Sequence, residues 1–181
     1  MINILLGIGC SSFLPNGATK NTVKPIQDGL MIESTVQIQD DHRSIFAVLP
    51  PPRSPQGMIL FDAGDSADES NPILNFLDQN NYTIEDVSHI VLTHEHQTHT
   101  EGLALFPDAE ILALSEAADE IIQQGGRVDT ILEAGETIEL GPHTLEVFSM
   151  PGHCDGNTAF LFNRTLIMGD SAVAYMDDTI E

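Results

Sequence analysis

Short apolar runs rich in β-branched residues make up most of this chain, and glycine, proline, asparagine and aspartate separate them. Runs of this length between turn-forming residues are typical of β-strands. The pattern predicts strands at about residues 2–8, 33–39, 44–49, 58–62, 88–93, 110–114, 137–140, 144–150, 158–163 and 165–168. Most of the chain is therefore expected to form sheet, with tight turns joining the last four strands.

Helices are predicted at two places between these strands. Asn71 is a candidate N-cap and Pro72 occupies the first helical position, which predicts a helix that starts there. A second helix is predicted over residues 115–123, with Ser115 as a possible cap and two glycines after its end. Residues 83–86 are expected to form a short capped turn that leads into the next strand.

The proline-rich segment 50–57 contains three consecutive prolines, which lack the N–H group needed for a strand ladder. It is expected to be a turn or hairpin tip that separates two strands, and not two domains. Strands stand on both sides of the two predicted helices, which indicates a mixed α/β (α+β) fold without strict βαβ alternation. At 181 residues the chain has the size of one domain, so residues 1–181 are expected to form a single domain.

Acidic side chains dominate the charge of the protein. The chain has 28 Asp and Glu against 6 Lys and Arg, a formal net charge of −22. Such a charge repels phosphate backbones and anionic membranes, so we expect a small-molecule substrate and no nucleic acid. No apolar run reaches the roughly 18 residues needed to span a membrane. Two cysteines form no disulfide framework, and the N-terminal stretch lacks the basic region of a signal peptide, so a cytoplasmic location is expected.

Three histidines, His94, His96 and His99, directly follow an apolar predicted strand. Residues two apart on an extended backbone point to the same side, so the first two can converge on one ion. Neutral imidazole is a favoured ligand of zinc, iron, nickel and copper. His153 and Asp170 also follow predicted strands. Because loops at strand ends gather at one edge of a sheet, the sequence predicts a metal site there.

The order of four short motifs resembles that of the metallo-β-lactamase superfamily, over about residues 30 to 175. The motifs are Phe61-Asp62-Ala63-Gly64, Thr93-His94-x-His96-x-x-His99-x-x-Gly102, Pro151-Gly152-His153 and Gly169-Asp170. Within the superfamily, residues 102–109 are most similar to the small metallo-β-lactamase domain-containing hydrolases. The resemblance implies an αββα sandwich with a metal site at one edge.

By matched position, the resemblance implies a metal cluster with five ligands: a first ion held by His94, His96 and His153, a bridging Asp170, and His99 for a second ion. Asp170 and His99 are also the expected catalytic side chains. Asp62 is expected to accept hydrogen bonds that orient a ligand or the histidine loop. Zinc with an open coordination position lowers the pKa of its water to about 7, which makes a hydroxide nucleophile.

Two departures from the family pattern limit this implication. The family carries an aspartate where this chain has Thr98, and a hydroxyl cannot replace that carboxylate as a ligand or a base. The second metal usually takes a further histidine, and none follows His153. We therefore expect one zinc ion per chain, with Thr98 beside its ligands. The chain is also C-terminally short for the family. Either it is a truncated or minimal form, or a second copy of the chain completes the layer on its C-terminal side.

These observations leave three functions open. The first is a metal-dependent hydrolase whose metal-bound hydroxide attacks a small ester, thioester, lactone, amide or phosphodiester. The alternative is a mononuclear iron oxygenase that resembles the persulfide dioxygenases of the same superfamily, with His94, His153 and Asp170 as iron ligands. The third is a non-catalytic metal-binding protein with a degenerate site, for which the loss of the family aspartate would be neutral.

Other reactive side chains are expected to have no chemical role. Cys154 is expected to be an inert thiol, because no Lys or Arg lies near it in sequence to lower its pKa. Glu95 and Glu101 flank the histidines and are expected to be solvated loop carboxylates. The remaining histidines are expected to be surface or strand-end residues: His42, His89 and His143.

Overall fold

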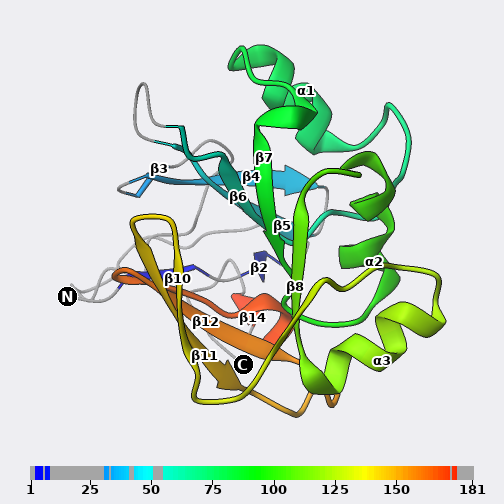
Figure 1. The fold of residues 1–181 in the computed structure, drawn as a ribbon, viewed down its shortest axis with the longest axis vertical. Helices are drawn as coiled ribbons and strands as arrows, with labels where there is room; N and C mark the ends of the chain where they lie inside the picture. Colours follow the sequence, from blue (N-terminus) through cyan, green and yellow to red (C-terminus); the bar gives the residue numbers. More distant parts are fainter. Residues whose placement is uncertain are drawn as a thin grey trace, which may run out of the picture.

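Helices cover one face of a first β-sheet, and a second sheet packs against its other face (Figure 1). The computed structural model describes residues 3–5, 7–8, 31–32, 34–40, 43–50, 55–171 and 173–174. In this part of the chain, no helix is long and apolar enough to cross a membrane. The expected mixed α/β sandwich is confirmed.

The first sheet has seven strands, in the order β3 (Met31–Ile32), β4 (Thr35–Asp40), β5 (Arg43–Val48), β6 (Met58–Phe61), β7 (Val87–Val91), β8 (Glu110–Leu114) and β9 (Thr130–Leu132). Strands β3 to β6 pair antiparallel, and β6 to β9 pair parallel. In β6, Leu60 packs on the helix side and Phe61 on the side of the second sheet. Because successive side chains alternate between two buried faces, these strands are continuous apolar runs.

Parallel strands need a crossover between them, and in this protein the crossovers carry the helices. Helix α1 (Pro72–Gln79) and the short 3₁₀ helix η1 (Ile84–Asp86) connect β6 to β7. Helix α2 (Gln97–Thr100) and η2 (Glu101–Leu105) connect β7 to β8, and α3 (Ser115–Gln123) connects β8 to β9. The apolar sides of α1 and α3 pack into one core with the helix-facing residues of the sheet.

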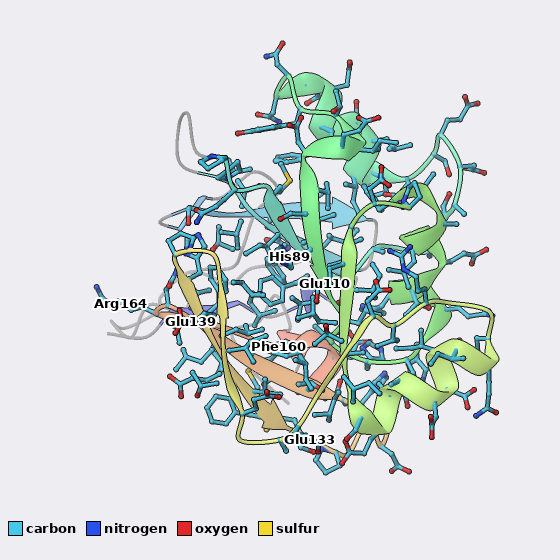
Figure 2. The ribbon with its side chains drawn as sticks, in the orientation of Figure 1. His89, Glu110, Glu133, Glu139, Phe160 and Arg164 are labelled. Carbon is cyan, nitrogen blue, oxygen red and sulfur yellow. The ribbon has the colours of Figure 1, made fainter. Side chains whose placement is uncertain are left out.

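The second sheet has five strands, in the order β1 (Asn3–Leu5), β13 (Thr165–Ile167), β12 (Thr158–Phe162), β11 (His143–Ser149) and β10 (Thr137–Leu140). A small sheet pairs β2 (Gly7–Ile8) with β14 (Val173–Ala174), and η3 (Gly169–Ser171) precedes β14. Between the two large sheets, the Phe61 ring lies 5.8 Å from that of Phe160 and 5.7 Å from that of Phe162. Figure 2 shows Phe160 inside this layer, whereas Glu133, Glu139 and Arg164 lie at the surface.

Most predicted elements are confirmed within one or two residues. The Asn71 side chain accepts a hydrogen bond from the Ile73 N–H at 2.9 Å, so the predicted N-cap of α1 is correct. Strands β5 and β6 pair antiparallel, as expected of strands on either side of the proline-rich segment. Residues 51–54 of that segment lie outside the described residues, as do Cys10 and His42.

Some predictions are wrong. The expected strand 2–8 is two strands in separate sheets, because β1 pairs with β13 and β2 with β14. The N-cap of α3 is Leu114, and Ser115 is instead the first helical residue, whose Oγ donates to the Glu116 carboxylate at 2.7 Å. The expected sandwich itself is confirmed, because α1 and α3 pack on one face of the first sheet and the second sheet packs on its other face.

Candidate metal centre

Four chain segments meet at one edge of the two sheets, and each brings one or more polar side chains. Asp62 directly follows β6, and the segment after β7 carries His94, His96 and, on α2, His99. His153 lies in the turn between β11 and β12, and Asp170 lies in η3 after β13. Because parallel strands β6 and β7 end at the same edge, all the ligands expected from sequence come together there.

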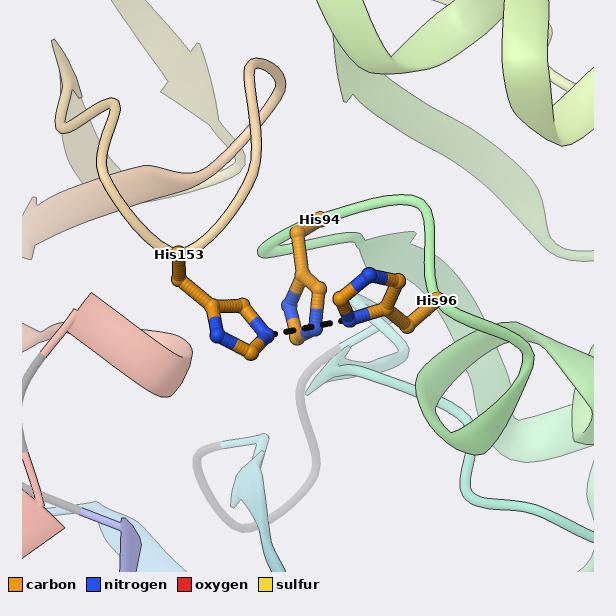
Figure 3. A group of neighbouring side chains, drawn as sticks. All are labelled: His94, His96 and His153. Carbon is orange, nitrogen blue, oxygen red and sulfur yellow. Dashed lines mark hydrogen bonds between the residues drawn. The ribbon is translucent and has the colours of Figure 1, made fainter.

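His94, His96 and His153 form the first group of potential ligands, with rings turned toward a common point (Figure 3). One ring nitrogen from each residue lies within 4.8 Å of the corresponding nitrogens of the other two. His153 Nε2 lies 3.0 Å from His96 Nδ1, which places a ring nitrogen from each of two loops at hydrogen-bond distance. Three imidazoles with converging lone pairs are a ligand set suited to a transition metal such as zinc.

His94 gives the clearest test of whether a metal fits this group. Its side chain is fully buried and its Nδ1 lies 3.0 Å from Thr93 Oγ1, but its Nε2 has no hydrogen-bond partner. A buried polar atom without a partner costs free energy, so such atoms are rare unless they serve a purpose. The Nε2 atom points to the group formed with His96 and His153, and a metal ion there would satisfy it.

Asp170 lies between this group and a second one formed with His94 and His99. One carboxylate oxygen is 3.5 Å from His153 Nε2 and 3.9 Å from His94 Nε2. The other oxygen is 3.7 Å from His99 Nε2, a second buried nitrogen without a hydrogen-bond partner. The carboxylate therefore faces both groups, which is the position that a bridging ligand needs.

Asp62 holds the histidine segment in place through hydrogen bonds. Its Oδ1 accepts a hydrogen bond from the Thr93 N–H at 2.8 Å, and its Oδ2 accepts one from the Thr93 hydroxyl at 2.8 Å. Oδ2 also lies 2.8 Å from His99 Nδ1. Because this contact fixes the Nδ1 side of the ring, the opposite nitrogen, Nε2, faces Asp170. The orienting role expected for Asp62 thus matches its contacts.

Burial and neighbouring charges shift the pKa values of three of these groups. Burial, and then the positive charge of His99, lower the pKa of His94 to about 4, so this imidazole is neutral at neutral pH. Burial also opposes charge on His99, but the Asp62 charge, the hydrogen bond to Asp62 and the Asp170 carboxylate 3.7 Å away outweigh it and raise that pKa to about 10. Burial opposes ionisation of Asp170, but the nearby His99 ring, 3.7 Å away, outweighs it and lowers the pKa of Asp170 to about 2.

Three further side chains lie near the expected ligands, and one of them, Glu95, differs from what the sequence suggested. Thr98 lies on α2 directly before His99, and among the described residues its side chain makes no hydrogen bond, so its expected role beside the metal stays a prediction. Glu95 is half-buried and accepts a hydrogen bond from Cys154 Sγ at 3.3 Å, so it is not a freely solvated carboxylate. Cys154 is inert as expected, because burial, and then Glu95, raise the pKa of its thiol to about 12.

Sequence reasoning also missed Asn157, which joins two of the ligand-bearing segments. This residue is fully buried, and its Nδ2 donates to the Met150 carbonyl at 3.0 Å and to Ser171 Oγ. It thereby links the turn that carries His153 to the segment that carries Asp170. No local pattern marks this residue, because its partners Met150 and Ser171 lie 7 and 14 residues away in the chain.

The fold and the site together define an α/β sandwich with a cluster of histidines at the edge of its sheets that could hold a metal ion. Residues 53–177 match the family model of the metallo-β-lactamase superfamily. The chain belongs to this superfamily, and the resemblance of its four motifs is thereby confirmed.

The relatives and solved structures that the chain matches agree with this assignment. It is 34% identical to hydroxyacylglutathione hydrolase 1 of Vibrio vulnificus over 116 residues, which cover 62% of this chain and 42% of that protein. It is 34% identical to the hydroxyacylglutathione hydrolase of Bartonella henselae over 115 residues, 61% of this chain and 43% of that protein. The match thus spans less than half the length of each relative.

Two solved metallo-β-lactamases illustrate the shared fold. A motif mutant of the Cronobacter sakazakii enzyme superposes with a TM-score of 0.64 at 22% identity, covering 86% of this chain and 62% of that one. The FEZ-1 enzyme of Legionella gormanii superposes with a TM-score of 0.61 at 19% identity, covering 88% of this chain and 58% of that one. At these identities the likeness shows the fold alone.

Proposed function

We propose that the protein is a metal-dependent hydrolase that holds one zinc ion through His94, His96 and His153. The observation that carries this proposal is that one ring nitrogen from each of these three histidines lies within 4.8 Å of the other two, while the buried His94 Nε2 has no hydrogen-bond partner. Catalytic zinc sites commonly have three protein ligands and one open position. When bound, zinc lowers the pKa of a water molecule to about 7 and polarises the scissile carbonyl oxygen.

Asp170 and His99 are the side chains that we expect to handle protons in this reaction. The lowered pKa of Asp170 keeps its carboxylate ionised, so its oxygens can accept a hydrogen bond from the attacking water and hold it in place. The raised pKa of His99 keeps a proton at Nε2, on the side that faces Asp170. That proton is available to a leaving group, and Asp62 keeps the ring in this orientation.

For the substrate, we propose a small thioester of the hydroxyacyl type. The curated relatives at 34% identity are hydroxyacylglutathione hydrolases, whose substrates by name are thioesters. The net charge of −22 argues against a nucleic acid, because it repels a polyphosphate chain. A thiolate is also a better leaving group than an alkoxide of similar size, so its departure needs less assistance from an acid.

An activity assay with matched variants tests this proposal. Zinc-loaded protein is offered a hydroxyacylglutathione thioester and the corresponding oxygen ester, before and after removal of metal with EDTA. We expect the thioester to be hydrolysed faster, EDTA to abolish turnover and added zinc to restore it. His153→Ala should remove activity, whereas His143→Ala, a histidine at the start of β11 outside the cluster, should not. A zinc-loaded protein without turnover on either ester would overturn the hydrolase proposal.

A second set of potential ligands supports an alternative function, that of an iron oxygenase. The Asp170 carboxylate lies 3.9 Å from His94 Nε2 and 3.5 Å from His153 Nε2, so two histidines and one carboxylate also converge. This ligand set is typical of mononuclear iron oxygenases. If the purified protein holds iron and consumes oxygen with a persulfide substrate, the oxygenase replaces the hydrolase. If it binds metal and shows neither activity, it is a non-catalytic metal-binding protein.

A further inference from the structure

Glu95 and Cys154 form a contact between the two loops that carry the three clustered histidines. Glu95 lies between His94 and His96 in sequence, and Cys154 directly follows His153. Cys154 Sγ donates a hydrogen bond to Glu95 Oε2 at 3.3 Å, across a separation of 59 residues in the chain. Each partner of this contact is thus the neighbour in sequence of a candidate ligand.

The surroundings of the pair are tightly packed. At Gly156, an added Cβ would collide with Glu95 Oε2 and would lie 2.6 Å from Ala117 Cβ on α3. These contacts leave no room for a side chain at position 156, where the His153 loop packs against the histidine loop and α3. Glu95 Oε2 is therefore held between Cys154 and the backbone of the same loop.

The chemistry of the two groups suits a persistent hydrogen bond. Cys154 is half-buried, and its S–H group is a weak hydrogen-bond donor that faces an oxygen of Glu95. An ionised carboxylate can only accept hydrogen bonds, so the thiol is the donor in this contact. Within the described residues, no Lys, Arg or His forms an ion pair with Glu95, so nothing there draws the carboxylate away from the thiol.

Neither residue is itself placed to bind the metal. Among the described residues, the groups of side chains whose ligand atoms converge contain His94, His96, His99, His153 and Asp170, but neither Glu95 nor Cys154. The pair can therefore act on a metal only through the position of the histidines beside it. The distance that the pair would control is the one between His96 Nδ1 and His153 Nε2, which is 3.0 Å.

We propose that Glu95 and Cys154 are a positioning pair, which holds the histidine loop and the His153 loop at the separation that metal binding requires. The inference rests on the proposed metal site and deepens it. Contacts that orient metal ligands typically change metal affinity by about 10- to 100-fold when they are removed. We expect removal of this contact to change metal affinity by an amount at the lower end of this range, because backbone hydrogen bonds also hold the two loops. One example is the hydrogen bond from the Thr158 N–H to the Thr93 carbonyl at 2.8 Å.

The test measures zinc affinity directly, without reference to any activity. Competition with a chelating dye gives the zinc dissociation constant of wild type, Cys154→Ala, Glu95→Ala and the double variant. Each single substitution is expected to weaken binding about tenfold, and the double variant no more than either one, because both remove the same contact. Cys154→Ser, whose hydroxyl still donates to Glu95, should retain most of the affinity. Glu101→Ala, an exposed carboxylate on η2, controls for the loss of a negative charge.

The possible outcomes separate this inference from the proposed function. If wild type binds zinc and the Cys154→Ala and Glu95→Ala variants bind it equally well, the positioning pair is refuted and the zinc site stands. Additive losses in the double variant, or a Cys154→Ser variant as weak as Cys154→Ala, would also refute the pair. If wild type binds no zinc, the proposed function fails and the inference fails with it. Urea denaturation of each zinc-free variant confirms that it is folded.

Discussion

The carboxylate of Asp62 lies 2.8 Å from Nδ1 of His99, and both side chains are buried. The same carboxylate accepts two hydrogen bonds from Thr93, the last residue before the histidine motif. Asp62 also has a backbone φ of 67°, in the left-handed region that aspartate and asparagine tolerate better than most residues. One side chain after β6 thus sets both the orientation of His99 and the start of the histidine segment after β7.

Replacing Asp62 with asparagine should therefore weaken both the fold and the metal site. Asparagine retains the left-handed backbone but puts an NH₂ group where one oxygen now accepts hydrogen bonds from Thr93 and His99. We expect a loss of about 1–3 kcal/mol in the free energy of unfolding of the metal-free protein, measured with urea. Asp78→Asn, the same change at an exposed position on α1, is the control. Equal stability of the two variants would contradict the structural role of Asp62.

The lowered pKa of His94 predicts that the metal-free protein loses stability in acid. Burial, and then the charge of His99, lower this pKa from its ordinary value near 6.5 to about 4. Between pH 4 and 6.5, the His94 imidazole binds a proton in the unfolded chain but not in the folded protein. The free energy of unfolding is therefore highest above pH 6.5 and decreases as the pH falls toward 4. Metal-free wild type should therefore lose stability relative to His94→Gln over this range. Urea denaturation at several pH values measures the difference, and a difference independent of pH would contradict the prediction.

Gly102 marks a close approach between the helical segment after the histidines and the turn after β6. A Cβ at this position would collide with the Ala63 carbonyl oxygen and lie 2.6 Å from Asn71 Nδ2. The Gly102 N–H donates to the Gly64 carbonyl at 3.2 Å, and the Ala63 N–H donates to the His99 carbonyl at 2.8 Å. The turn and the helical segment are therefore in direct backbone contact.

Gly102→Ala should push these two segments apart. We expect it to lower the free energy of unfolding by about 1–3 kcal/mol, the usual cost of overpacking a tight contact. Zinc affinity should fall as well, because the turn carries Asp62 and the segment carries His99. Ala104→Ser, at an exposed position of the same η2 segment, should leave thermal stability and zinc affinity unchanged. If Gly102→Ala binds zinc as tightly as wild type, the contact does not support the site.

The strands were predictable where hydrophobic residues form continuous runs, as in β6 and β8, because burial on both faces requires such runs. Strand β9 was missed because it has only three residues, with Ile131 exposed. Helix α2 was missed because its sequence, Gln-Thr-His-Thr, has no apolar periodicity. The pairing of β1 and β2 with strands late in the chain depends on tertiary contacts, which no local pattern records.

That the candidate ligands meet could be predicted from their motifs, whereas the contacts that support them could not. The order of the motifs indicated that His94, His153 and Asp170 meet, and the structure brings them together. The hydrogen bond between Glu95 and Cys154 joins loops 59 residues apart, and its existence depends on how closely those loops pack. The expectation of one zinc per chain, and that of a single domain over residues 1–181, remain predictions.

The metal content of the purified protein tests the central proposal most directly. Elemental analysis of protein produced without added metal should find about one zinc per chain, and less than a tenth of that in the His94→Ala and His153→Ala variants. His143→Ala should keep the wild-type content. Two zinc ions per chain would contradict the single-ion site, and iron in place of zinc would favour the oxygenase. If His94→Ala and His153→Ala hold as much metal as wild type, the assignment of the metal centre is wrong.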